Sequence, residues 1–136
     1  MGNGTRLNFA SYAIDHSNCF SHDCLLNFLE RVFINCGTYT VDEMTRQVKI
    51  DDIEPGDVFV KAGSPGHAMI VVDVATNKTT GEKIYLLAQS YMPAQDMHIV
   101  INPNDQNLSP WYKVSDVEKI VTPGWVFDVA QLKTWK

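Results

Sequence analysis

The sequence predicts an α+β fold in which an N-terminal helix packs on an antiparallel β-sheet. Residues 21–36 repeat their apolar side chains at the three-to-four spacing of an amphipathic helix. Within residues 57–101, short apolar runs are separated by turns rich in Gly, Pro and Asp, a pattern typical of strands. Together these patterns predict one helix followed by an antiparallel sheet of about five to six strands.

The helix has recognisable start and stop signals. Ser21 or Asp23 is a candidate N-cap, and Gly37 ends the helix. Its apolar positions are Leu25, Leu26, Phe28, Leu29, Val32 and Phe33. One broad apolar face predicts a core helix. The lead-in, residues 1–20, has no clear pattern, and a weaker helical stretch is expected at Val41–Arg46.

The strands follow a turn rich in Pro, Gly and acidic residues at 51–57. After a first strand at residues 58–60, the β-branched run His67–Val74 is typical of an interior strand buried on both faces. The polar residues 75–83 predict a hairpin loop. Ile84–Ser90 is the expected antiparallel partner, and Met97–Ile101 is a further strand.

The C-terminal segment, residues 102–136, is marked by aromatic residues rather than by a strand pattern. Its Trp and Tyr side chains are expected to cover the core as a flap. No repeat or linker interrupts the 136 residues, a length that suits one hydrophobic core. We therefore expect a single domain over residues 1–136.

Charge and hydropathy exclude two classes of function. The net charge of −5 gives no basic footprint, so direct nucleic-acid binding is not expected. No apolar run approaches the roughly 20 residues that span a bilayer. Because residues 1–6 show no signal-peptide pattern, the chain as written is expected to be cytoplasmic, or exported if a leader has been removed.

The cysteines predict neither a disulfide framework nor a metal site. Cys19, Cys24 and Cys36 are odd in number and irregular in spacing, which predicts a reduced chain. His16 and His22 lie near two of them but lack the spacing of a zinc site. We expect no metal and no cofactor.

Three residues form the candidate catalytic set: Cys24, His67 and Gln89. Cys24 stands in the first turn of the helix, where the unpaired N–H groups favour a thiolate. His67 follows a Gly-Ser-Pro-Gly turn at the mouth of a strand, and Gln89 lies near the end of the partner strand. Gln89 faces His67 in one strand register, and a one-residue slip would bring Ala88 or Ser90 there instead. The sequence leaves this register open. The alternative for Cys24 is a buried, unreactive thiol.

The order of these elements resembles the NlpC/P60 and CHAP cysteine peptidases and amidases. The resemblance rests on Asp-Cys at residues 23–24, Pro-Gly-Asp-Val-Phe-Val at 55–60 and Gly-His-Ala-Met-Ile-Val-Val-Asp at 66–73. It implies a papain-like fold in which Cys24 is the nucleophile, His67 the base and Gln89 the residue that orients the base.

Longer strings of the sequence are also recognisable: residues 55–73, Gln-Ser-Tyr-Met-Pro-Ala-Gln at 89–95 and Ser-Pro-Trp-Tyr at 109–112. With these strings the chain resembles an uncharacterised bacterial family, domain of unknown function 4846. That family is found mainly in Bacteroidetes and is often attached to an exported leader. The resemblance extends over more of the chain than the previous one. It implies no activity, because none is established for the family.

Further polar residues follow the second strand of the predicted hairpin. Four of them are candidate binding residues: Ser90, Tyr91, Gln95 and His98. They are expected to line the same groove as His67 and Gln89. The alternative is that Gln95, Asp96 and His98 cap a strand.

The leading functional hypothesis is a thiol hydrolase or amidase that acts on a peptide or a cell-wall amide. The alternative is a non-catalytic protein-binding module, or a small inhibitor, built on the same fold. The expected partner is accordingly a peptide, a cell-wall-like substrate or another protein.

Overall fold

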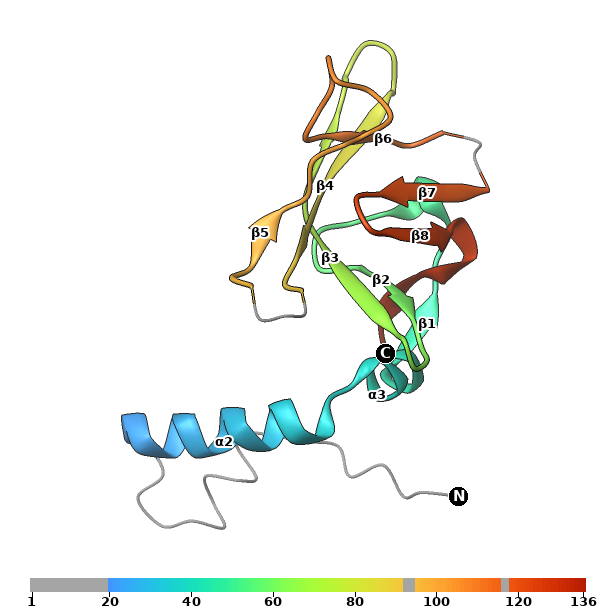
Figure 1. Ribbon diagram of the computed structural model, residues 1–136. Helices are drawn as coiled ribbons and strands as arrows, with labels where there is room; N and C mark the ends of the chain where they lie inside the picture. Colours follow the sequence, from blue (N-terminus) through green and yellow to red (C-terminus); the bar gives the residue numbers. More distant parts are fainter. Residues whose placement is uncertain (1–19, 92–94, 116–117) are drawn as a thin grey trace.

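A computed structural model of the chain describes residues 20–91, 95–115 and 118–136. Two helices lead the described chain, α2 (His22–Asn35) and α3 (Thr38–Met44), and antiparallel strands follow (Figure 1). The predicted α+β class is confirmed. The predicted helix is α2, and the weaker stretch at 41–46 corresponds to α3, which begins earlier and ends where β1 starts. The predicted lead-in falls, except for residue 20, outside the described residues.

The main sheet contains seven strands within the described residues. Its order is β1-β9-β2-β3-β4-β5, and β6 also pairs with β4. The bounds are β1 (Thr45–Gln47), β2 (Val58–Lys61), β3 (His67–Thr76), β4 (Lys83–Gln89), β5 (His98–Ile99), β6 (Tyr112–Lys113) and β9 (Leu132–Trp135). The predicted range of 57–101 was therefore too narrow, because β1, β6 and β9 lie outside it.

Strand β3 is interior, between β2 and β4, and pairs antiparallel with both. This confirms the predicted position and partner of the apolar run at 67–74. The prediction that both of its faces are buried is wrong, since Met69 and Val71 are buried but Val72 is 39% exposed. An irregularity in the β3–β4 register lies between Val71 and Asp73.

The core lies on one face of this sheet and is closed by a second, two-stranded sheet. That sheet is the hairpin of β7 (Lys119–Thr122) and β8 (Trp125–Asp128). Phe127 of β8 is fully buried, and its ring centroid lies 5.8 Å from that of Phe59 on β2. Burying one such side chain contributes about 1.5–3 kcal/mol. Phe127 and Tyr112 of the C-terminal segment are thus part of the core, whereas Trp135 is 47% exposed, so the expected cover of Trp and Tyr side chains is observed only in part.

Two tyrosines stack on each other within this core. The ring centroids of Tyr85 and Tyr112 are 5.7 Å apart, and the Tyr112 hydroxyl donates a 2.6 Å hydrogen bond to the carbonyl of Ile101. Burial raises the pKa of both phenols, and the neighbouring Tyr112 raises that of Tyr85 further. Both therefore stay neutral at pH values that ionise an exposed tyrosine.

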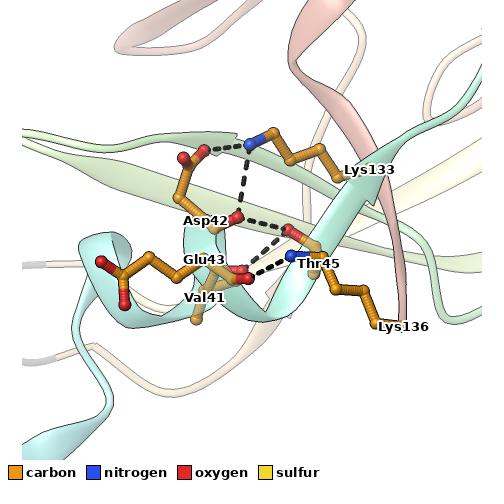
Figure 2. Close-up of polar contacts among 6 residues, drawn as sticks. All are labelled: Val41, Asp42, Glu43, Thr45, Lys133 and Lys136. Atoms are coloured by element: carbon orange, nitrogen blue, oxygen red, sulfur yellow. Dashed lines mark hydrogen bonds and ion pairs between the residues drawn. The ribbon is translucent and has the colours of Figure 1, made fainter. Parts of the chain in front are cut away.

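Helix α3 is anchored to the last strand by lysine side chains (Figure 2). Lys133 of β9 pairs with the carboxylate of Asp42, and the Lys136 ammonium donates a 2.6 Å hydrogen bond to the carbonyl of Glu43. Positive charges at the C-terminal end of α3 offset the negative end of the helix dipole. The contacts hold α3 beside β1 and β9.

Helix α2 extends away from the sheet (Figure 1). It has the predicted amphipathic pattern, yet none of its residues is buried, and Phe33 and Ile34 are 76% and 81% exposed. The prediction of a core helix is therefore wrong for α2. Its apolar face formed as expected but lies outside the core that the described strands enclose. No helix in the described part of the chain is long and apolar enough to span a membrane.

Candidate functional site

The centre of the candidate site is a hydrogen-bonded pair, His67 and Gln89. His67 is the first residue of β3 and Gln89 the last residue of β4. Ile70 pairs with Ala88, so Gln89 is opposite Met69, and alternation along β3 places His67 on the same face as Met69. The distance from His67 Nε2 to Gln89 Oε1 is 2.6 Å. The register that the sequence left open therefore selects Gln89 and not Ser90.

This contact defines which ring nitrogen of His67 carries the proton. An amide oxygen only accepts hydrogen bonds, so His67 Nε2–H is the donor. In the neutral ring, Nδ1 then keeps its lone pair and is an acceptor. None of the hydrogen bonds between described residues uses this Nδ1. The ring is thus oriented by one nitrogen and able to accept a proton or a hydrogen bond at the other.

Aromatic side chains pack against His67. The Trp125 ring stacks on His67 with centroids 4.9 Å apart and an interplanar angle of 12°, and the Tyr91 ring lies 5.1 Å from His67. Trp125 Nε1–H donates a 3.0 Å hydrogen bond to the Tyr91 hydroxyl. We call this group, with Lys61 and Gln89, the His67 cluster.

Lys61 adds a positive charge to the cluster. Its ammonium lies 5.9 Å from the centroid of the Trp125 ring, and Lys61 is the register partner of His67 on β2. The residue is exposed, and no ion pair joins it to a carboxylate in the described ranges. The charged group is therefore available to a ligand.

Sequence reasoning missed Trp125 and Lys61. Trp125 was expected only as a cover of the core, and it lies far along the chain from His67. Its contact with His67 depends on how the β7–β8 hairpin docks on the sheet, for which no local pattern exists. Lys61 could have been predicted, because antiparallel pairing across the short turn at 62–66 places it beside His67.

The turn before His67 leaves no space for a side chain at residue 66. A Cβ built on Gly66 would lie 2.5 Å from the Gly63 carbonyl oxygen and would also overlap the Thr38 hydroxyl. The first residue of α3 thus packs directly against the turn that presents His67.

Gly66→Ala is accordingly expected to lower the free energy of unfolding by about 1–3 kcal/mol, because the backbone of Gly63 has to move. Urea unfolding measures this change. Ser64→Ala, an exposed position in the same turn, is the control and should leave stability unchanged. Equal stability of both variants and the wild type would show that the turn is not tightly packed.

The structure does not bring Cys24 to His67. Cys24 lies in the first turn of α2, with its N–H 3.3 Å from the Ser21 hydroxyl, and this end of α2 is remote from β3 (Figure 1). Its sulfur is disulfide-bonded, whereas Cys36 is a free thiol. The prediction of a fully reduced chain is wrong, because an odd cysteine count still permits one bridge and one unpaired thiol.

Of the candidate binding residues, Tyr91 belongs to the His67 cluster. Ser90 is exposed after β4, and Gln95 is exposed, with its backbone N–H 3.0 Å from the Tyr91 carbonyl oxygen. His98, on β5, is in register with Gln89, and its Nδ1 lies 2.9 Å from the carbonyl oxygen of Asp96. Among the residues described, no hydrogen bond or ring contact joins these three to His67.

No group of three or more His, Cys, Asp or Glu residues in the described ranges could hold a metal ion. The chemistry that the cluster itself offers is hydrogen bonding, one positive charge and apolar contact. The molecule is thus an α+β domain with an oriented histidine at the end of an antiparallel sheet. The family described as "Domain of unknown function (4846)" matches residues 3–134, and the chain belongs to that family. No curated protein and no solved structure matches the chain.

Proposed function

We propose that this domain is a non-catalytic protein-binding module whose ligand contacts the His67 cluster. The observation that supports this function is the oriented imidazole, with Nε2 bonded to Gln89 and Nδ1 left as an acceptor. A ligand N–H or O–H would donate to Nδ1. The Lys61 ammonium would bind a carbonyl or carboxylate group beside it.

The aromatic residues of the cluster favour a polypeptide ligand. Trp and Tyr are enriched among the residues that dominate protein–protein binding energy, because their rings combine a large apolar surface with a polar tip. Trp125 and Tyr91 are both partly exposed, and each already has its polar atom paired with the other. A ligand can therefore pack on them without leaving an unpaired polar group.

A thiol hydrolase of the NlpC/P60 type is the second candidate. One observation favours it: a base that takes a proton at Nδ1 while a side-chain amide orients Nε2 is the arrangement that a thiol nucleophile needs. The proposal assigns Cys24 as nucleophile, His67 as base, Gln89 as orienting residue and a peptide or cell-wall amide as substrate. It also requires a papain-like fold, reduction of the Cys24 disulfide and movement of α2 toward the sheet.

The two candidates are separated by a peptide-display experiment. A random peptide library is selected on the immobilised domain, and an enriched peptide is synthesised and titrated by calorimetry. His67→Ala should weaken binding by about tenfold, the effect of losing one buried hydrogen bond. Thr76→Ala, at the exposed far end of β3, should bind as the wild type does.

Two results of this experiment would contradict the binding function. Absence of any enriched peptide, or unchanged affinity of His67→Ala, would remove the His67 cluster as the binding site. The same peptide and soluble cell-wall fragments are also incubated with the domain and dithiothreitol, then analysed by mass spectrometry. Cleavage that disappears in Cys24→Ala would overturn the non-catalytic function and establish the hydrolase.

A further inference from the structure

We propose that β5, the edge strand of the main sheet, pairs with β5 of a second copy of this chain, so that two sheets join across a twofold axis. No residue of the His67 cluster lies on β5, and the inference does not depend on the proposed function. It follows from the backbone, the side chains and the charges of residues 96–102.

The outer side of β5 pairs with no other strand of the described residues. β5 stands last in the strand order and forms an outer margin of the sheet (Figure 1). Val100 N–H donates a 2.8 Å hydrogen bond to the carbonyl of Leu87, and His98 is in register with Gln89. Because alternate residues of an antiparallel strand direct their N–H and C=O groups to opposite sides, those of Ile99 point away from β4.

The side chains at this edge are apolar and exposed. Met97, Ile99 and Ile101 are 67%, 44% and 63% exposed, while Val100 between them is buried. Proteins usually protect a sheet edge with Lys, Pro or inward-pointing charges, because an apolar edge pairs readily with another strand. Residues 97–101 contain no Asp, Glu, Lys or Arg.

The charge distribution selects a second copy as the occupant. The chain carries a net charge of −5, which opposes contact between copies over most of their surface. Antiparallel pairing with Ile99 on the twofold axis joins two uncharged segments. Asp96 of one copy then lies opposite Asn102 of the other, so that no carboxylate faces a carboxylate.

The same register makes the edge self-complementary. Ile99 of each copy donates its N–H to the carbonyl of the other Ile99, and Met97 lies opposite Ile101 on both sides of the axis, as an interface with twofold symmetry requires. Apolar cross-strand pairs of this kind contribute roughly 0.2–1 kcal/mol each. The Ile101 carbonyl already accepts from Tyr112, so the shared ladder is short and the dimer is weak.

Sedimentation velocity over a roughly hundredfold range of protein concentration tests the dimer, since mass action shifts a weak association across that range. The weight-average mass of the wild type should rise from 15.3 kDa toward twice that value. Ile99→Lys and Met97→Lys should remain monomeric. Val121→Lys, at a 42% exposed position of β7 in the other sheet, is the matched control and should dimerise as the wild type does.

Amide hydrogen exchange identifies the strand involved. The Ile99 N–H points away from β4, and in a dimer it should exchange more slowly as protein concentration rises, in step with the mass. Far-UV circular dichroism establishes that each lysine variant is folded. A wild type that is monomeric throughout would overturn the proposal. So would dimerisation of folded Ile99→Lys, or loss of the dimer in Phe33→Lys but not in Ile99→Lys, which would assign the contact to α2.

Discussion

Phe127→Ala is expected to lower the free energy of unfolding by about 3–5 kcal/mol, the range for removing a large buried aromatic side chain. Phe127 is fully buried, and its ring lies 5.8 Å from that of Phe59 and 6.3 Å from that of His67. It therefore connects the β7–β8 hairpin to the main sheet. Urea unfolding followed by tryptophan fluorescence measures the change.

Val126→Ala is the control for this prediction. Val126 is the next residue toward the N-terminus on β8, but it is 44% exposed, so its truncation should change stability by less than about 0.5 kcal/mol. If both variants lost the same small amount, Phe127 would not be a core residue. The docking of the hairpin on the sheet would then be wrong, together with the stacking of Trp125 on His67.

Gln89→Leu is expected to lower the free energy of unfolding by about 1–3 kcal/mol and also to change the protonation of His67, because it removes the acceptor of a largely buried hydrogen bond. Gln89 is only 6% exposed. The substitution also releases His67 Nε2–H from its one described partner. Nitrogen-15 NMR of the imidazole should show one dominant tautomer, protonated on Nε2, in the wild type and a mixture of tautomers in the variant.

Ser90→Ala separates this effect from a general disturbance of the end of β4. Ser90 is exposed and adjacent, and its variant should keep both the stability and the tautomer of the wild type. An unchanged tautomer in folded Gln89→Leu would mean that Gln89 does not orient the ring. His67 would then lose the property on which both candidate functions depend.

The parts of the fold that the sequence predicted are those specified by neighbouring residues. α2 has a local apolar repeat and start and stop signals, and the β3–β4 hairpin combines two apolar runs with a polar loop. β1 and β9 have only three and four residues, and Thr45 pairs with Trp135 from the other end of the chain. No local sequence pattern predicts that such short and distant segments pair with each other.

The same distinction applies to the candidate site. His67 and Gln89 were predicted to meet because they flank one hairpin, and only their register was open. Trp125 is brought to them by tertiary packing, which the sequence does not encode in a readable pattern. The position of Cys24 depended on whether α2 packs on the sheet, and an amphipathic repeat indicates an apolar face without naming the surface that the face meets.

The position of β9 has a consequence for how the chain folds as it is synthesised. β9 is the last described strand to leave the ribosome, yet it lies between β1 and β2 rather than at an edge. Until it is inserted, β1 has no partner in the sheet and the adjacent side of β2 is an open edge. The nascent domain therefore cannot complete its sheet before Leu132–Trp135 emerge, and until then it exposes two unpaired strand edges of the kind that favours aggregation.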